Sequence, residues 1–123
     1  STLPAFLQGA DLVIDALGGI EFRPTLLNEA SKAGLPLITG FVAGTTGLAS
    51  TVYPQGKSPA AFWQGDNLHG AEKILGNMAT IVSMIATIQA SEVFRIITRE
   101  TPRLRDKVLV ADSEHLTFEL LEL

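Results

Sequence analysis

One long uncharged stretch limits the possible folds of the chain more than any other feature. Residues 74–91 contain no Asp, Glu, Lys or Arg, a length close to that of a membrane span. Polar side chains interrupt the stretch: Asn77, Thr80, Ser83, Thr87 and Gln89. We therefore predict a buried helix over residues 71–98, continuous or broken near Gly76, with no membrane role. Because its middle is apolar nearly all round, we expect it to be covered on most sides, by a sheet and by a second subunit.

The amino-terminal part predicts a strand followed by a helix. Residues 11–15 are a short apolar run between glycines, which is typical of a parallel strand buried on both faces. Residues 21–33 then predict a helix, with Pro24 in the first turn and Gly34 as the stop. Residues 35–43 and 48–53 predict a parallel strand that feeds an antiparallel partner through the turn at residues 44–47.

The remaining segments complete an α/β pattern. Residues 54–70 contain Pro, Gly, Ser and Asn with little periodicity and predict a crossing loop. Residues 107–112 and 115–121 predict two strands of a terminal β-hairpin, and the second alternates in a way that fits a sheet with one wetter face. We expect one α/β domain over residues 1–123, with a mixed sheet, a long buried helix and a terminal β-hairpin.

Composition excludes several classes of function. The formal charge is −4, and we expect the nine Lys and Arg to be scattered over the fold without forming a clustered positive surface, which argues against nucleic-acid binding. There is no cysteine, so disulfides, a thiolate nucleophile and a cysteine-ligated zinc site are impossible in this chain. The same absence of cysteine makes the cytoplasm the expected location, and the first residues lack the basic and long apolar regions of a signal peptide.

Four segments, taken in order, resemble one known family. They are residues 10–23 (ADLVIDALGGIEFR), residues 34–40 (GLPLITG), residues 89–92 (QASE) and the terminal hairpin with Asp112. Together they resemble the second half of the MoeB/ThiF/HesA family of ubiquitin-activating-like adenylyltransferases. The resemblance implies the carboxyl-terminal half of a Rossmann-like ThiF fold, without the amino-terminal nucleotide-binding half. We therefore expect the sequence to begin partway through the fold.

The resemblance also implies an activity. Family members use magnesium ATP to adenylate the C-terminal Gly-Gly of a small ubiquitin-like or sulfur-carrier protein. That chemistry needs a glycine-rich loop for the phosphates, and no Gly-x-Gly-x-x-Gly occurs here. We therefore expect ATP and Mg in the full-length parent, no cofactor for this chain alone, and no zinc. The expected partners are the carrier protein and a second copy of the chain, as a homodimer.

Four residues are the candidates for binding the cofactor: Asp15, Gly18, Gly19 and Arg23. Asp15 either faces the nucleotide site or accepts neighbouring backbone N–H groups, and the glycine pair would let a ligand approach the backbone closely. Gly18 stands where the family usually has a second Asp that serves magnesium and ATP. Arg23 matches a family Arg that could steady phosphate or the carrier tail; its alternative role is a surface salt bridge. No residue is assigned a catalytic or metal-binding role.

Other notable side chains have simpler explanations. His69 and His115 lie far apart in the sequence and suit structural or solvent-facing positions better than a metal site. Gln89 and Glu92 are expected to make polar contacts to the sheet or across a dimer. The pair at residues 62–63 (Phe-Trp) either anchors a carrier protein or plugs the edge of the core.

Two functions remain open from the sequence. The first is the distal half of an adenylyltransferase whose parent activates a carrier for sulfur transfer or cofactor synthesis, and retention of Asp15 and Arg23 favours it. The second is a non-catalytic dimeric scaffold derived from that fold, which Gly18 and the absence of cysteine favour. We expect the chain to be a truncated part of a longer active protein.

Overall fold

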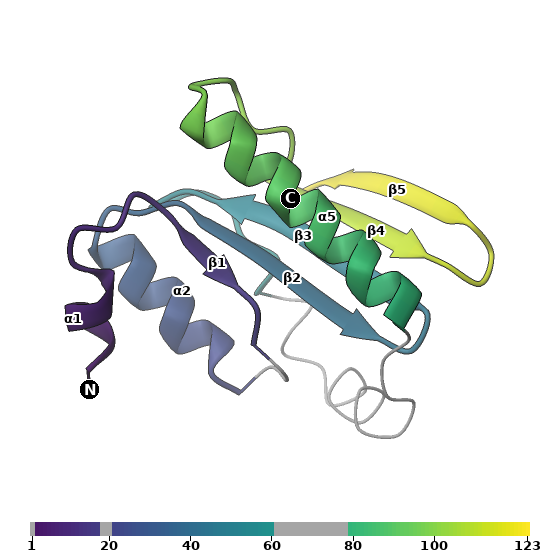
Figure 1. The fold of residues 1–123 in the computed structure, drawn as a ribbon, viewed down its shortest axis with the longest axis horizontal. Helices are drawn as coiled ribbons and strands as arrows, with labels where there is room; N and C mark the ends of the chain where they lie inside the picture. The colour runs from purple at the N-terminus through teal and green to yellow at the C-terminus, as the bar shows by residue number, and fades with distance from the viewer. Residues whose placement is uncertain (1, 18–20, 61–78) are drawn as a thin grey trace.

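A mixed five-stranded sheet organises the chain in the computed structural model, which describes residues 2–17, 21–60 and 79–123. The elements in chain order are α1 (Leu3–Leu7), β1 (Val13–Asp15), α2 (Arg23–Lys32), β2 (Leu37–Ala43), β3 (Thr46–Val52), α5 (Ala79–Ile97), β4 (Lys107–Asp112) and β5 (Thr117–Glu122). The strands follow the order β1-β2-β3-β4-β5, and among these pairs only β1 and β2 run parallel (Figure 1). The predicted α/β class, the mixed sheet and the terminal hairpin are therefore confirmed.

Helix α2 covers one face of the sheet beside β1 and β2. It has proline in its first turn, which the missing N–H permits, and Gly34 takes the left-handed conformation (φ +73°) that ends the helix. Its buried Leu26 and Ala30 pack against Leu37 and Val52, which are paired across β2 and β3. The predicted strand, helix and strand therefore form where the sequence places them, within two residues at each end.

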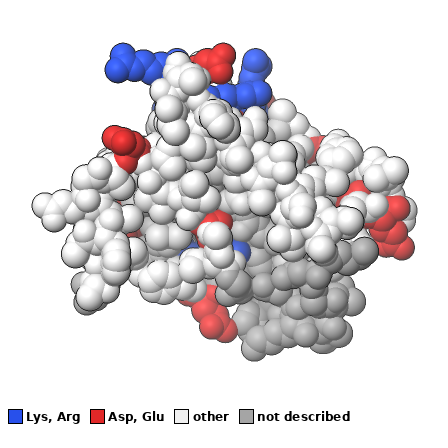
Figure 2. Space-filling view, in the orientation of Figure 1, with Lys and Arg blue, Asp and Glu red and all other residues white. Residues whose placement is uncertain are grey.

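Helix α5 crosses the opposite face of β2 and β3, and the described residues cover only one side of it. The side chains that it buries are Ile81, Ile85, Gln89 and Glu92. Phe94 and Ile97 remain 70% and 65% exposed, and Figure 2 shows few charged side chains over this helix. The expected coverage by the sheet is confirmed, whereas the coverage by a second subunit stays a prediction, since none of the described residues forms a second layer over the outer face of α5. The first part of the predicted helix, residues 71–78, lies outside the described residues.

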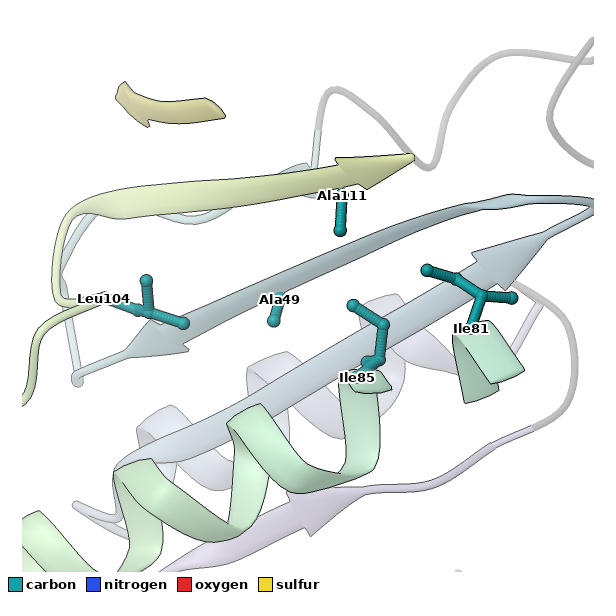
Figure 3. Close-up of a cluster of buried hydrophobic side chains, with 5 residues drawn as sticks. All are labelled: Ala49, Ile81, Ile85, Leu104 and Ala111. Carbon is teal, nitrogen blue, oxygen red and sulfur yellow. The ribbon is translucent and has the colours of Figure 1, made fainter. Parts of the chain in front are cut away.

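Two glycines let α5 approach the sheet closely. A Cβ added at Gly40 would lie 2.8 Å from Cγ2 of Ile85, and one added at Gly47 would lie 2.7 Å from its Cδ1. Ile85 therefore fills the space over both strands, and it joins Ile81, Ala49 and their neighbours in one buried cluster (Figure 3). Although α5 has the length and apolar composition of a membrane span, its buried Gln89 and Glu92 face this sheet, as in the core helix of a folded domain.

Strand β5 is an exposed edge. In the part of the chain that the structure describes it pairs only with β4, and every one of its side chains is exposed, including Phe118 (54%) and Leu120 (52%). The expected division into a covered and a wetter face is therefore wrong for this strand: no helix of the described residues packs on either side. The hairpin turn falls at residues 113–116 and ends at Leu116, which has φ +53°.

Candidate functional site

A cleft of about 260 Å³ opens at the carboxyl end of β1. Strand β1 stops at Asp15, whereas its parallel neighbour β2 continues to Ala43, and α5 closes the space from one side. The residues that line this cleft include Asp15, Leu17, Arg23, Gly40, Phe41 and Gln89. The carboxyl ends of parallel strands are the usual binding edge of an α/β sheet. The cleft is therefore the candidate functional site.

Asp15 and Arg23 form a buried ion pair at the floor of this cleft. Nη1 of Arg23 lies 3.0 Å from Oδ2 of Asp15, and the two side chains are 2% and 1% exposed. The hydroxyl of Thr39 donates to the same oxygen (2.7 Å), and the Leu17 amide donates to Oδ1 (3.0 Å). The carboxylate is therefore neutralised and hydrogen-bonded on both oxygens, as a buried charge requires.

The guanidinium of Arg23 also holds backbone on both sides of the cleft. Nη2 donates to the Leu17 carbonyl (2.7 Å), Nη1 donates to the Gly40 carbonyl, and the group lies 5.1 Å from the centre of the Phe41 ring. The alternative of a surface salt bridge is wrong, because α2 turns its first residue inward against the sheet. The pair therefore fixes the end of β1 and the middle of β2 relative to each other.

Gln89 joins α5 to the same place. Its Nε2 donates to the carbonyls of Asp15 (3.0 Å) and Ile38 (3.2 Å). The expectation of a polar contact from this helix to the sheet is confirmed, but its position at the candidate site was not predicted. Thr39 was also missed. The available signal was weak: a single Gln within an apolar helix, opposite a glycine in a strand.

Glu92 lies in a second buried polar cluster, away from the cleft. It is 2% exposed and accepts hydrogen bonds from Thr51 Oγ1 (2.9 Å) and from the amides of Arg103 (3.0 Å) and Leu104 (2.6 Å). This confirms the predicted contact to the sheet and gives Glu92 a structural role, since its oxygens hold the loop that leads into β4.

His115 is exposed at the hairpin turn, as expected for a solvent-facing histidine. Its Nδ1 lies 2.7 Å from Oδ2 of Asp112, and this hydrogen bond raises the pKa of His115 and lowers the pKa of Asp112. The positions of Gly18, Gly19, His69 and the pair at residues 62–63 lie outside the described residues. Within the described ranges, no three His, Asp or Glu side chains lie close enough to hold a metal ion.

Comparison with known proteins finds one family over almost the whole chain. A family model described as "ThiF family" matches residues 2–123. A curated relative, the SAMP-activating enzyme E1 of Haloferax volcanii, is 25% identical over 122 residues, which cover 97% of this chain and 45% of that protein. The chain thus spans less than half the length of the relative that it matches.

Solved structures share the fold. The crystal structure of E. coli MccB with ATP matches with a TM-score of 0.71 at 14% identity, and the match covers 98% of this chain and 39% of the MccB chain. The crystal structure of PaaA has the same TM-score and identity, with coverages of 98% and 37%. MccB has also been solved in complex with N-formylated MccA. At this level of identity the likeness shows the fold alone.

Proposed function

The chain belongs to the ThiF family, and on this premise we propose that it forms the carboxyl-terminal half of an ATP-dependent adenylyltransferase. The substrate would be the C-terminal carboxylate of a small ubiquitin-like or sulfur-carrier protein, or of a peptide. Two relatives support this: one is named a SAMP-activating enzyme, and the other was crystallised with ATP and with MccA. The parent would serve sulfur transfer or cofactor synthesis.

The observation that carries the proposal is the fixed backbone at the carboxyl end of β1. The Asp15–Arg23 pair and Gln89 hold three segments around the cleft: the end of β1, the middle of β2 and the helix α5. Adenylation needs little covalent participation from the protein, because positioning and electrostatic stabilisation supply most of the rate. The role of this half is to form a rigid floor on which the nucleotide and the carrier tail are aligned.

The residues of this half fit ATP only in part. Asp15 is buried, is paired with an arginine and accepts three hydrogen bonds, so it is poorly placed to serve as a principal magnesium ligand. The described residues also contain no cluster of metal ligands. We assign the phosphate loop, and the groups that hold magnesium, to the rest of the parent protein. When bound there, ATP would supply the α-phosphate that the carrier carboxylate attacks, with pyrophosphate leaving.

We propose a homodimer in which the outer face of α5 is covered. Val82, Phe94 and Ile97 are 43%, 70% and 65% exposed on this helix, and dimer interfaces are richer in apolar side chains than the rest of the surface. Light scattering on the full-length protein at micromolar concentration should give twice the monomer mass. A monodisperse monomer would refute the dimer.

ATP–pyrophosphate exchange tests the proposed activity. The full-length protein that contains this chain is mixed with ATP, labelled pyrophosphate and small proteins ending in Gly-Gly from the same genome. We expect exchange that depends on one such protein and is lost when its final glycine is removed. Absence of exchange, together with absence of ATP binding by calorimetry, would contradict the proposal.

One observation favours the second candidate function, a non-catalytic dimeric scaffold. The two charged side chains of the candidate cleft, Asp15 and Arg23, neutralise each other and are both buried. A scaffold would keep this pair for stability alone. Light scattering would still show a dimer of such a scaffold, but calorimetry would show no ATP binding. These two results together distinguish it from the adenylyltransferase.

A further inference from the structure

Cationic side chains gather around a hollow of about 740 Å³ at the carboxyl-terminal end of α5. The residues that line this basic hollow are Arg95, Arg99, Glu100, Thr101, Pro102, Arg103 and Lys107. Figure 2 shows blue side chains along the edge of the molecule where α5 ends. The expectation of scattered positive charge is therefore wrong at this end of the fold. The helix end, the following loop and β4 each bring cations to one place.

Two of these cations have no acidic partner among the described residues. Arg95 lies 3.8 Å from buried Glu92, and Lys107 lies 3.8 Å from exposed Glu122. Arg99 and Arg103 form no ion pair with the described part of the chain. Glu100 is the one acid that lines the hollow. Because like charges around one hollow repel one another, an anion that enters it interacts favourably with all four cations.

The backbone that carries these cations is fixed before any ligand arrives. The buried carboxylate of Glu92 accepts hydrogen bonds from the amides of Arg103 and Leu104. At the helix end, the Glu100 amide donates to the Arg95 carbonyl (2.7 Å), and Arg99 takes a left-handed conformation with φ +65°. Groups held in this way lose little backbone entropy on binding, which favours affinity.

The helix dipole explains only part of this cluster. A cation in the last turn of a helix, such as Arg95, is stabilised by the negative end of the dipole. That effect fades beyond the final turn, whereas Arg103 and Lys107 belong to the loop and to β4. Their presence on the same hollow in a chain of formal charge −4 points to a ligand that is itself acidic.

We propose that the basic hollow binds an acidic segment of a partner polypeptide. Its charges are spread over three elements and a volume that far exceeds one phosphate group, which suits several carboxylates along a chain. Among the described residues, no aromatic side chain lines the hollow, so this part of the chain gives it no stacking surface of the kind that single-stranded nucleic acids use.

The hollow is separate from the candidate cleft. Gln89 lines the cleft and Arg95 lines the hollow, and six residues of helix separate them by about 9 Å. A partner seated in the hollow would leave the cleft open. This inference does not rest on the proposed function, because neither the cleft nor ATP enters it.

Fluorescence anisotropy on the full-length protein tests the proposal, with fluorescein-labelled octaglutamate as the probe. We expect binding that weakens as salt rises and that falls about tenfold in Arg103→Glu. The conservative variant Arg103→Lys should retain most of the affinity. The matched control is Lys32→Glu, which makes the same change of charge at a 66% exposed site on α2. It should bind the probe as tightly as the unsubstituted protein does.

Three results would overturn the proposal. The first is that the unsubstituted protein and Arg103→Glu bind octaglutamate with equal affinity when circular dichroism shows that both are folded. The second is equal affinity for octaglutamine, which has no charge. The third is preference for another anion: tighter binding of an eight-residue oligothymidine would indicate nucleic acid, and displacement of the probe by inorganic phosphate at micromolar concentration would indicate a phosphate site.

Discussion

Replacing Arg23 by alanine should destabilise the fold more than almost any other single change. The substitution leaves the Asp15 carboxylate, which is 1% exposed, without its cation. It also removes the donors to the carbonyls of Leu17 and Gly40 and the contact with the Phe41 ring. Removing one partner of a buried pair costs about 3–5 kcal/mol. That is a large part of the total stability of about 5–15 kcal/mol that a domain has.

Urea denaturation of the full-length protein, followed by circular dichroism, measures this loss. The matched control is Lys32→Ala on the same helix, where the ion pair with Glu29 is exposed (3.5 Å) and should contribute at most about 0.5 kcal/mol. In a double-mutant cycle, Asp15→Ala with Arg23→Ala should cost clearly less than the sum of the two single changes. A loss below about 1 kcal/mol for Arg23→Ala, or additive effects in the cycle, would refute the buried pair.

Three further predictions concern other parts of the molecule. Gly47→Ala places a methyl group against Ile85 and should lower the free energy of unfolding by about 1–3 kcal/mol; unchanged stability in urea denaturation would count against the close approach of α5. Glu92→Ala leaves two amides and a hydroxyl without an acceptor and should cost about 3–5 kcal/mol in the same assay, so a near-neutral effect would show that this carboxylate is not buried. The pair of Asp112 and His115 should stabilise the fold most between about pH 3.8 and 6.5, because the pKa of His115 is raised above its ordinary 6.5 and the pKa of Asp112 is lowered below 3.8. The stabilisation is lost as pH rises through the raised pKa or falls through the lowered one, so the melting temperature of His115→Gln should lie furthest below that of the parent inside this window; a constant difference across the pH range would argue against the pair.

The sequence predicts most elements of this fold because their signals are local. The strand at β1, the helix α2 and the β2–β3 pair each show their own period and their own terminating glycine or turn. The terminal hairpin is recognisable for the same reason. Their boundaries differ by a few residues, since the ends of strands depend on which neighbours are available for pairing.

Burial was predicted less well because it depends on neighbours that are distant in the sequence. The apolar pattern of α5 indicates a helix but not how many of its sides are covered, and the alternation in β5 does not show that nothing packs on it. Arg23 has the position of a surface residue in a first helical turn. It becomes buried because α2 packs against the sheet beside Asp15.

The candidate site was predicted in part for the same physical reason. Asp15 and Arg23 were singled out, and the structure brings them together. Their other partners, Thr39 and Gln89, lie 24 and 74 residues from Asp15 in the chain, and no local pattern connects them. The basic hollow was missed although its four cations lie within residues 95–107, because their spacing does not show that the helix end, the following loop and β4 turn them to one place.

A crystal structure of the full-length protein with a non-hydrolysable ATP analogue tests the central claim most directly. The account predicts that the triphosphate lies at the carboxyl end of β1, over the floor formed by Asp15 and Arg23, with the phosphate loop contributed by residues outside this chain. An analogue bound elsewhere in the molecule, or a protein that binds no nucleotide while its Asp15–Arg23 pair is intact, would contradict it.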